Sequence, residues 1–227
     1  MNPRLLPLVI WVAGLAGFMV MAAFAYSNWY FPGDLWVTHH LQKIHSSAFN
    51  DFVKIPETLV SDPYAEIIWV AALAALWFTH HRWEAILLLF IAPTGWVLVR
   101  IAKIAVDRPR PATPLIAIAG AATEGHSFPS GHEMSAFMVF GSSLYIAGVL
   151  VGPLLLRLAL QLLCLYGVVF TGVARIYHGD HWLSDIYGSA LLGTLVLACY
   201  IAFDRAVAFR PSRVAARNPT PYLGRQT

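Results

Sequence analysis

Three short polar segments of the chain carry residues that could bind a phosphate group and attack it. They are residues 103–111 (KIAVDRPRP), 129–132 (PSGH) and 174–185 (ARIYHGDHWLSD). Their residues include three cations, two imidazoles and a carboxylate that could act together: Lys103, Arg110, Arg175, His132, His181 and Asp185. Fixed cations can neutralise a phosphate during phosphoryl transfer, and an imidazole can serve as the nucleophile. This set of residues therefore favours phosphoryl-transfer chemistry without a metal ion.

The PSGH segment has the composition of a helix N-terminus that binds an anion. Ser130 is a favoured N-cap residue, and Gly131 lets the backbone approach a ligand closely. The free N–H groups of the first helical turn then point toward the ligand. His132 adds an imidazole beside the same position, where it could donate a proton. Taken alone, PSGH is explained equally well by a plain turn and helix cap.

His181 and Asp185 are four residues apart, so they share one helix face if a helix begins near Asp180. A carboxylate that binds one ring nitrogen of a histidine leaves the other nitrogen free to act as nucleophile or base. We therefore expect Asp185 to hold His181. A metal site that also includes His178 is the alternative, but the neighbouring cations would repel a metal ion. For His178 and Asp180 we otherwise expect a role in shaping the loop.

The order and spacing of these residues resemble the type 2 phosphatidic acid phosphatases (PAP2), within the acid phosphatase/vanadium haloperoxidase superfamily. The family pattern is K-x6-R-P, then P-S-G-H, then S-R-x5-H-x3-D. Residues 103–185 match this pattern except at Ala174, where the family has serine. The resemblance implies that one hydroxyl contact to the phosphate is missing, so that phosphate binding is weaker but activity is retained.

The resemblance implies a role for each residue of the pattern. His181 would attack the phosphorus and form a phosphohistidine, Asp185 would orient His181, and His132 would protonate the leaving oxygen. The substrate phosphate would be bound by five residues: Lys103, Arg110, Ser130, Gly131 and Arg175. No metal ion or other cofactor is implied, so activity is expected to survive EDTA.

The composition is that of an integral membrane protein. Of the 227 residues, 58% are hydrophobic and 12% are charged, and a soluble domain carries about twice that charge. Six runs are candidates for membrane-spanning helices: residues 5–26, 64–78, 84–103, 133–150, 154–173 and 184–203. The first could be a signal peptide, because residues 23–25 have the A-x-A form, but its length favours an uncleaved helix. Pro93 predicts a kink in the third. We therefore expect an all-α fold with six transmembrane helices.

Six spans put both termini on one side of the membrane, and the charge pattern makes that side cytoplasmic. Arg4, Arg82 and Arg157, with five arginines of residues 204–227, place eight of the 15 basic residues there. We expect residues 1–203 to form a six-helix phosphatase domain and residues 204–227 a basic, disordered cytoplasmic tail. Residues 34–54 are too polar to span, so we expect an amphipathic helix in the outer interface. The three motif segments would then meet at the outer (periplasmic) face of the plasma membrane.

Polar residues outside the family pattern have less specific expectations. Arg108 and His126 are expected at the surface of the outer loops, and Glu133 is expected to face away from the site. Arg100, one turn before Lys103, would either extend to the membrane interface or contact a second phosphate.

These expectations describe a membrane enzyme that hydrolyses a phosphate monoester or diphosphate of a lipid, with no nucleic acid partner. The resemblance, with a compact size and short loops that look bacterial, favours undecaprenyl diphosphate as substrate. Phosphatidylglycerophosphate and phosphatidic acid follow, because the motifs contact the phosphate rather than the lipid tail. Three alternatives are a phosphotransferase with a sugar-lipid acceptor, a non-catalytic lipid-phosphate binder, and the soluble haloperoxidase branch, which six spans oppose.

Overall fold

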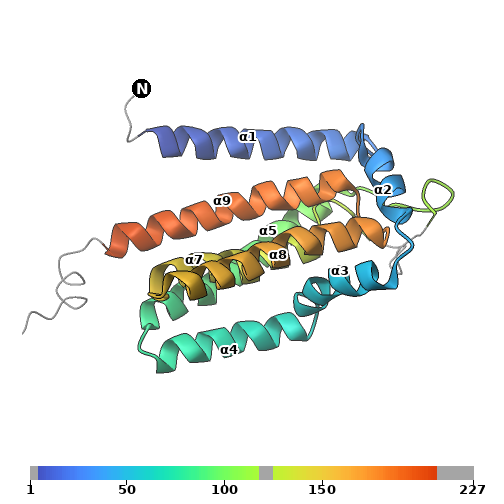
Figure 1. Cartoon of the computed structure of the whole chain (residues 1–227). Coiled ribbons are helices and arrows are strands. Elements are labelled where there is room, and N and C mark those ends of the chain that lie inside the picture. The colour runs from blue at the N-terminus through green and yellow to red at the C-terminus, as the bar shows by residue number, and fades with distance from the viewer. Residues whose placement is uncertain (1–4, 118–124, 209–227) are drawn as a thin grey trace, which may run out of the picture.

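The chain folds as a bundle of long helices with two short helices at one end (Figure 1). A computed structural model describes residues 5–117 and 125–208, and within these ranges the regular structure is helical throughout, which confirms the expected all-α fold. The elements are α1 (Leu6–Ser27), α2 (Asp34–Gln42), α3 (Ser47–Leu59), α4 (Tyr64–Phe78), α5 (Arg82–Val106), α6 (Gly131–Ala136), the π-helical turn η1 (Phe137–Gly141), α7 (Ser142–Leu150), α8 (Leu154–Tyr177) and α9 (Leu183–Ala208).

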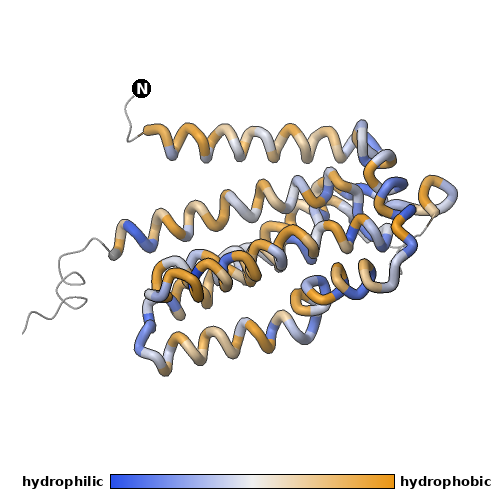
Figure 2. Tube along the Cα trace, viewed as in Figure 1, coloured by the Kyte–Doolittle hydropathy of each residue, from blue (hydrophilic) through white to orange (hydrophobic). Residues whose placement is uncertain are grey.

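Among residues 5–117 and 125–208, five helices are long and apolar enough to cross a membrane by themselves: α1, α5, the continuous run Gly131–Leu150, α8 and α9. Hydrophobic residues run along these helices (Figure 2), and many of their large apolar side chains are exposed on the outside of the bundle. In α1, only 11% of the most apolar window is buried. Apolar side chains that point outward along whole helices suit contact with lipid tails.

The predicted second span differs from the other five. Helix α4 has 15 residues, which is shorter than the roughly 20 that a membrane requires. It reaches that length only with α3, from which it is bent by 56°. A sixth crossing would therefore need the bent pair of α3 and α4, and α3 comes partly from the segment that the sequence assigned to the interface.

The predicted interfacial helix over residues 34–54 is wrong as a single element. The structure divides this segment into α2 and α3, and the hydroxyl of Ser46 caps α3 by accepting from Phe49 N at 3.3 Å. Helix α3 does not lie free on a surface, because its Val53 packs against Ala174 of α8 and both residues are fully buried. This packing brings the end of α3 to the same end of the bundle as the three motif segments.

Helix α9 starts three residues after Asp180, where a helix would have carried His181 on its face, and it ends later than the predicted sixth span. It begins at Leu183, and it continues to Ala208, so residues 204–208 belong to this helix rather than to a disordered tail. Asp204 is buried and accepts hydrogen bonds from Trp83 Nε1 at 2.8 Å and Tyr145 OH at 2.6 Å. Residues 209–227, the rest of the predicted tail, lie outside the described residues.

Candidate active site

The three motif segments meet at the end of the bundle opposite the start of α1 and the end of α9 (Figure 1). Backbone and side-chain contacts tie them together. Ser130 N donates to Asp185 O at 3.3 Å, and Arg110 Nη1 donates to Asp180 O at 3.2 Å. The structure therefore brings the second and first segments onto the third, as the sequence predicted.

His181 and Asp185 are neighbours, but by a different geometry from the one expected. Because α9 begins at Leu183, His181 lies in the turn before the helix rather than on its face. Asp185 Oδ2 accepts from Trp182 N at 2.9 Å and lies 3.4 Å from His181 Nδ1. The hydroxyl of Ser127 donates to the same carboxylate oxygen. Asp185 therefore binds a backbone N–H at the N-terminus of α9 and also faces the imidazole of His181.

Arg108 is buried at the centre of this arrangement, and its expected surface position is wrong. It is 1% exposed. Its guanidinium contacts Asp185 Oδ1 at 2.5 Å and Asp34 Oδ2 at 3.1 Å, and it donates to Ser184 Oγ at 2.8 Å. A buried cation requires such pairing. Arg108 thus holds the carboxylate that faces His181 and links α2 to the start of α9.

The electrostatic surroundings keep His181 neutral. Burial lowers the pKa of His181 to about 3, and the carboxylate of Asp185 opposes this shift. The positive charges of Arg175 and Lys103 lower the pKa further. Below the ordinary histidine pKa near 6.5, this side chain therefore still carries a free electron pair. A neutral imidazole with one nitrogen beside a carboxylate is suited to nucleophilic attack.

The PSGH segment caps the helix that starts at Gly131. Ser130 Oγ accepts from Glu133 N at 3.4 Å, as an N-cap serine does. Glu133 is buried rather than solvated: it is 2% exposed, and its side chain occupies the space that Gly172 leaves on α8. His132, by contrast, is partly exposed, toward a cavity that it shares with Lys103.

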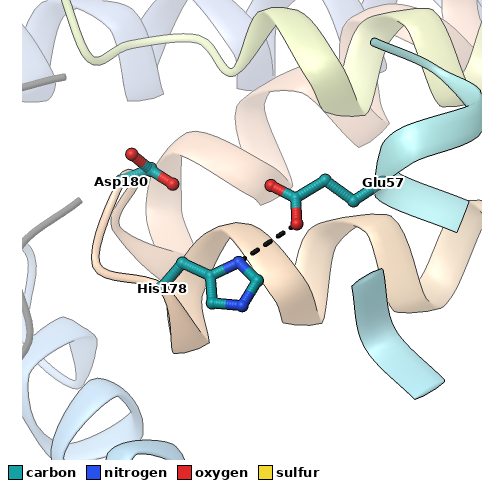
Figure 3. Close-up of side chains that lie close together, drawn as sticks. All are labelled: Glu57, His178 and Asp180. Carbon is teal, nitrogen blue, oxygen red and sulfur yellow. Dashed lines mark ion pairs between the residues drawn. The ribbon is translucent and has the colours of Figure 1, made fainter. Parts of the chain in front are cut away.

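Two carboxylates from different segments hold Arg175. They belong to Glu57 and Asp180, which Figure 3 shows close to His178. Arg175 Nη1 lies 2.5 Å from Glu57 Oε1, and its Nη2 lies 3.2 Å from Asp180 Oδ2. Glu57, at the end of α3, also contacts His178 Nδ1 at 3.0 Å. Asp180 and His178 therefore do more than shape the loop, because with Glu57 they fix the Arg175 side chain.

The same cluster could in principle hold a metal ion, because Glu57, His178 and Asp180 offer ligand atoms within 4.8 Å of one another. The guanidinium of Arg175 contacts both carboxylates, and its charge opposes a cation there. The alternative metal site of His178, His181 and Asp185 does not fit either, because His178 is turned toward Glu57 and Asn50.

Two arginines of the family pattern have buried donors that are left unpaired. The Nε atoms of Arg110 and Arg175 are buried and have no hydrogen-bond partner within the described ranges. Burial and the charge of Arg175 lower the pKa of Arg110, which indicates that the two cations repel each other. Unpaired buried N–H groups and neighbouring like charges are both costly unless an anion lies between them. This corner of the site thus suits a phosphate group.

Ala174, the departure from the family pattern, is explained by packing. Its side chain is fully buried against Val53 of α3 and Tyr177. In this chain the position therefore contributes to the contact between α3 and α8.

Four residues with roles at the site did not follow from the sequence pattern: Asp34, Glu57, Arg108 and Ser127. Asp34 is the first residue of the segment expected to form an interfacial helix, and Glu57 lies three residues beyond the end of that segment. Ser127 lies two residues before Pro129, the first residue of PSGH, and this closeness in sequence was the one signal that could have indicated its role.

A cavity of about 260 Å³ opens from the site toward the side of the bundle. Lys103 and His132 line it, together with Arg100 and Asp62. A second cavity of about 390 Å³ lies beside it between α4, α5 and α6 and shares Asp62 with the first. The lining of the second cavity includes apolar side chains such as Trp69 and Met138. Polar groups near the site are thus followed by an apolar space between helices.

Comparisons with known proteins agree with these observations. The model of the PAP2 superfamily matches residues 83–207. Phosphatidylglycerophosphatase B of Bacillus subtilis (strain 168) is 30% identical over 137 residues, which cover 59% of this chain and 64% of that protein. The chain thus aligns with slightly less than two thirds of the length of this relative.

Two solved structures have the same fold. A transmembrane PAP2 type phosphatidylglycerolphosphate phosphatase from Bacillus subtilis superposes with a TM-score of 0.73 and 25% identity, over 88% of this chain and 98% of the other. LpxE of Aquifex aeolicus superposes with a TM-score of 0.57 and 24% identity, over 76% of this chain and 96% of the other. The second likeness concerns the fold alone.

Proposed function

The chain belongs to the PAP2 superfamily, and from this premise we propose that it is a multi-pass membrane phosphatase that removes a phosphate group from a lipid. The observation that carries the proposal is the pair of buried, unpaired Nε donors of Arg110 and Arg175, beside the neutral imidazole of His181. Cations and free N–H groups would bind the phosphate, and the imidazole would attack it.

The proposed reaction has two steps. In the first, a nitrogen of His181 forms a bond to phosphorus while the bond from phosphorus to the lipid oxygen breaks, and His132 donates its proton to that oxygen. In the second, His132 removes a proton from water, the water oxygen bonds to phosphorus, and the bond to His181 breaks to release inorganic phosphate. Asp185 stabilises the positive charge on His181, since its carboxylate lies 3.4 Å from Nδ1.

The proposed phosphate-binding groups are those of the family pattern. Lys103, Arg110 and Arg175 would contact the phosphate oxygens, with the backbone N–H of Gly131 and the hydroxyl of Ser130, at the helix N-terminus that Ser130 caps. These fixed groups would supply the positive charge that a metal ion supplies in other phosphatases. We therefore expect activity without added cofactors.

A lipid substrate fits the cavities beside the site. The apolar space between α4, α5 and α6 would accept the part of the tail nearest the phosphate while the rest remains in the bilayer. Undecaprenyl diphosphate is the leading candidate by family resemblance, followed by phosphatidylglycerophosphate and phosphatidic acid. The name of the Bacillus subtilis relative favours phosphatidylglycerophosphate among these.

The proposed orientation places the site at the outer face of the plasma membrane and the termini in the cytoplasm. The distribution of arginines supports it, because Arg82 and Arg157 lie at the end of the bundle remote from the site, as does Arg205 of α9.

The test is phosphate release from a panel of lipid phosphates and diphosphates by the purified full chain in detergent with EDTA. Release by the wild type and none by His181→Ala is expected. Equal release by both would contradict His181 as the nucleophile. If wild type released no free phosphate, phosphate transferred to a sugar-lipid acceptor in a parallel assay would identify a phosphotransferase instead.

A further inference from the structure

Arg100 is a cation within a membrane-spanning helix that the proposed reaction does not use. It lies on α5 one turn before Lys103, a separation of about 4.5 Å along the helix axis. Its side chain is exposed, and its guanidinium carbon lies 5.7 Å from the centroid of the Trp96 ring. Within the described parts of the chain no carboxylate forms an ion pair with it. An ionised group in a span is costly and points to a functional role.

The position of Arg100 relative to the reaction follows from the cavity that it lines. The cavity of about 260 Å³ is bounded by Arg100, Lys103 and His132. Because His132 would protonate the leaving oxygen, the leaving group lies on this side of the phosphorus. Arg100 is one turn farther along α5, in the direction of the apolar cavity, so it would face the leaving group rather than the phosphate that is transferred to His181.

We propose that Arg100 binds a second phosphate group, the one that stays on the lipid after the reaction. The proposal rests on the proposed function and names the class of substrate: lipids with a phosphate in the leaving group. One kind is the lipid diphosphates, in which the leaving oxygen belongs to the second phosphate. The other is phosphatidylglycerophosphate, in which a glycerol separates the two phosphates. Phosphatidic acid has no such group.

The surroundings of Arg100 suit this role. A guanidinium binds phosphate through paired N–H donors in its plane, and stacking on an aromatic ring leaves those edge donors free. The Arg100 guanidinium lies over the Trp96 ring, 5.7 Å from its centroid. An ammonium at this position would keep the charge but lose the paired donors. Arg100→Lys therefore separates charge from geometry.

Asp62 provides a test of opposite sign. It lines the same cavity and carries a negative charge, which repels a second phosphate. Removing this charge should favour substrates with two phosphates, whereas removing the charge of Arg100 should disfavour them. A general loss of folding or membrane insertion cannot produce both changes.

The experiment compares kcat/KM for farnesyl diphosphate, phosphatidylglycerophosphate and phosphatidic acid in mixed micelles. Arg100→Gln should lower the ratio of either two-phosphate substrate to phosphatidic acid at least tenfold, mainly through KM. Arg100→Lys should give a ratio between those of wild type and Arg100→Gln, and Asp62→Asn should raise the ratio above that of wild type. The matched control is Arg82→Gln, because the Arg82 guanidinium lies over the Trp77 ring, 5.3 Å from its centroid, at the other end of α5. An unchanged ratio in Arg100→Gln would overturn the proposal.

A binding measurement separates this proposal from the proposed function. In the His181→Ala background, a fluorescent farnesyl diphosphate and its monophosphate are titrated onto the protein in detergent. Arg100→Gln should weaken binding of the diphosphate selectively, and equal weakening of both ligands would overturn the second-phosphate site. Absence of phosphate release by wild type, with this selective binding intact, would refute the proposed hydrolysis alone.

Discussion

Replacing Arg108 by methionine should destabilise the protein and impair catalysis together. Methionine keeps much of the buried volume but removes the positive charge. Asp34 and Asp185 are 2% and 0% exposed. Both carboxylates would lose the guanidinium that contacts them, at 3.1 Å and 2.5 Å respectively. Breaking a buried ion pair by removing one partner leaves an uncompensated charge.

The size of the effect follows from the donors that remain. Breaking a buried pair typically costs about 3–5 kcal/mol. Asp185 keeps the hydrogen bonds from Trp182 N and Ser127, and Asp34 keeps those from Phe31 N and Ser184 N. The lower end is therefore expected, about 3 kcal/mol, which for a chain of this size corresponds to a fall in Tm of about 6–12 °C.

Thermal unfolding in detergent and the rate of phosphate release are the two assays. Arg108→Met should also lower kcat at least tenfold, because Asp185 loses the contact at Oδ1 that fixes it beside His181. Arg82→Met is the control, since Arg82 is exposed and its loss should cost less than about 0.5 kcal/mol. Adding Asp34→Asn to Arg108→Met should restore part of the stability, because it removes one of the two unpaired charges.

A stability of Arg108→Met within about 0.5 kcal/mol of wild type, matching the control, would refute the buried position of Arg108. A large loss of stability with unchanged kcat in the folded fraction would instead refute its control over Asp185.

Two further predictions concern the phosphate site. Glu57→Gln should raise KM about tenfold with a smaller change in kcat, because Arg175 loses one of the two carboxylates that orient it. The control is Asn50→Ala, which removes the contact to Nε2 of His178 and should leave KM unchanged. Equal effects of the two substitutions would contradict the role of Glu57. The pKa of His181 is lowered to about 3, so its imidazole stays neutral as the pH falls through 6.5. The value of kcat/KM for a lipid monophosphate and for a lipid diphosphate should therefore show no common decrease between pH 7 and pH 5. A decrease near pH 6.5 with both substrates would contradict a neutral, buried nucleophile.

The sequence by itself determined the elements and the list of reacting groups. Apolar runs predicted five of the six spans closely, because a helix in lipid must bury its own backbone hydrogen bonds and shield them with apolar side chains along its whole length. The spacing of residues 103–185 predicted which segments meet, since helices of similar length return the chain to the same end of the bundle. The apolar runs are a local property of the sequence, and the meeting of the motif segments depends only on how many times the chain crosses the membrane.

Only the tertiary structure decided which groups support the reacting ones. Arg108 and Asp34 are 74 residues apart, Ser127 and Asp185 are 58 apart, and Glu57 lies 118 residues before Arg175. A carboxylate on an amphipathic segment looks the same in sequence whether it faces water or a buried guanidinium. The packing of α3 on α8 and the turn before α9 make that choice, because they exclude water and bring the buried charges into contact with groups of opposite charge.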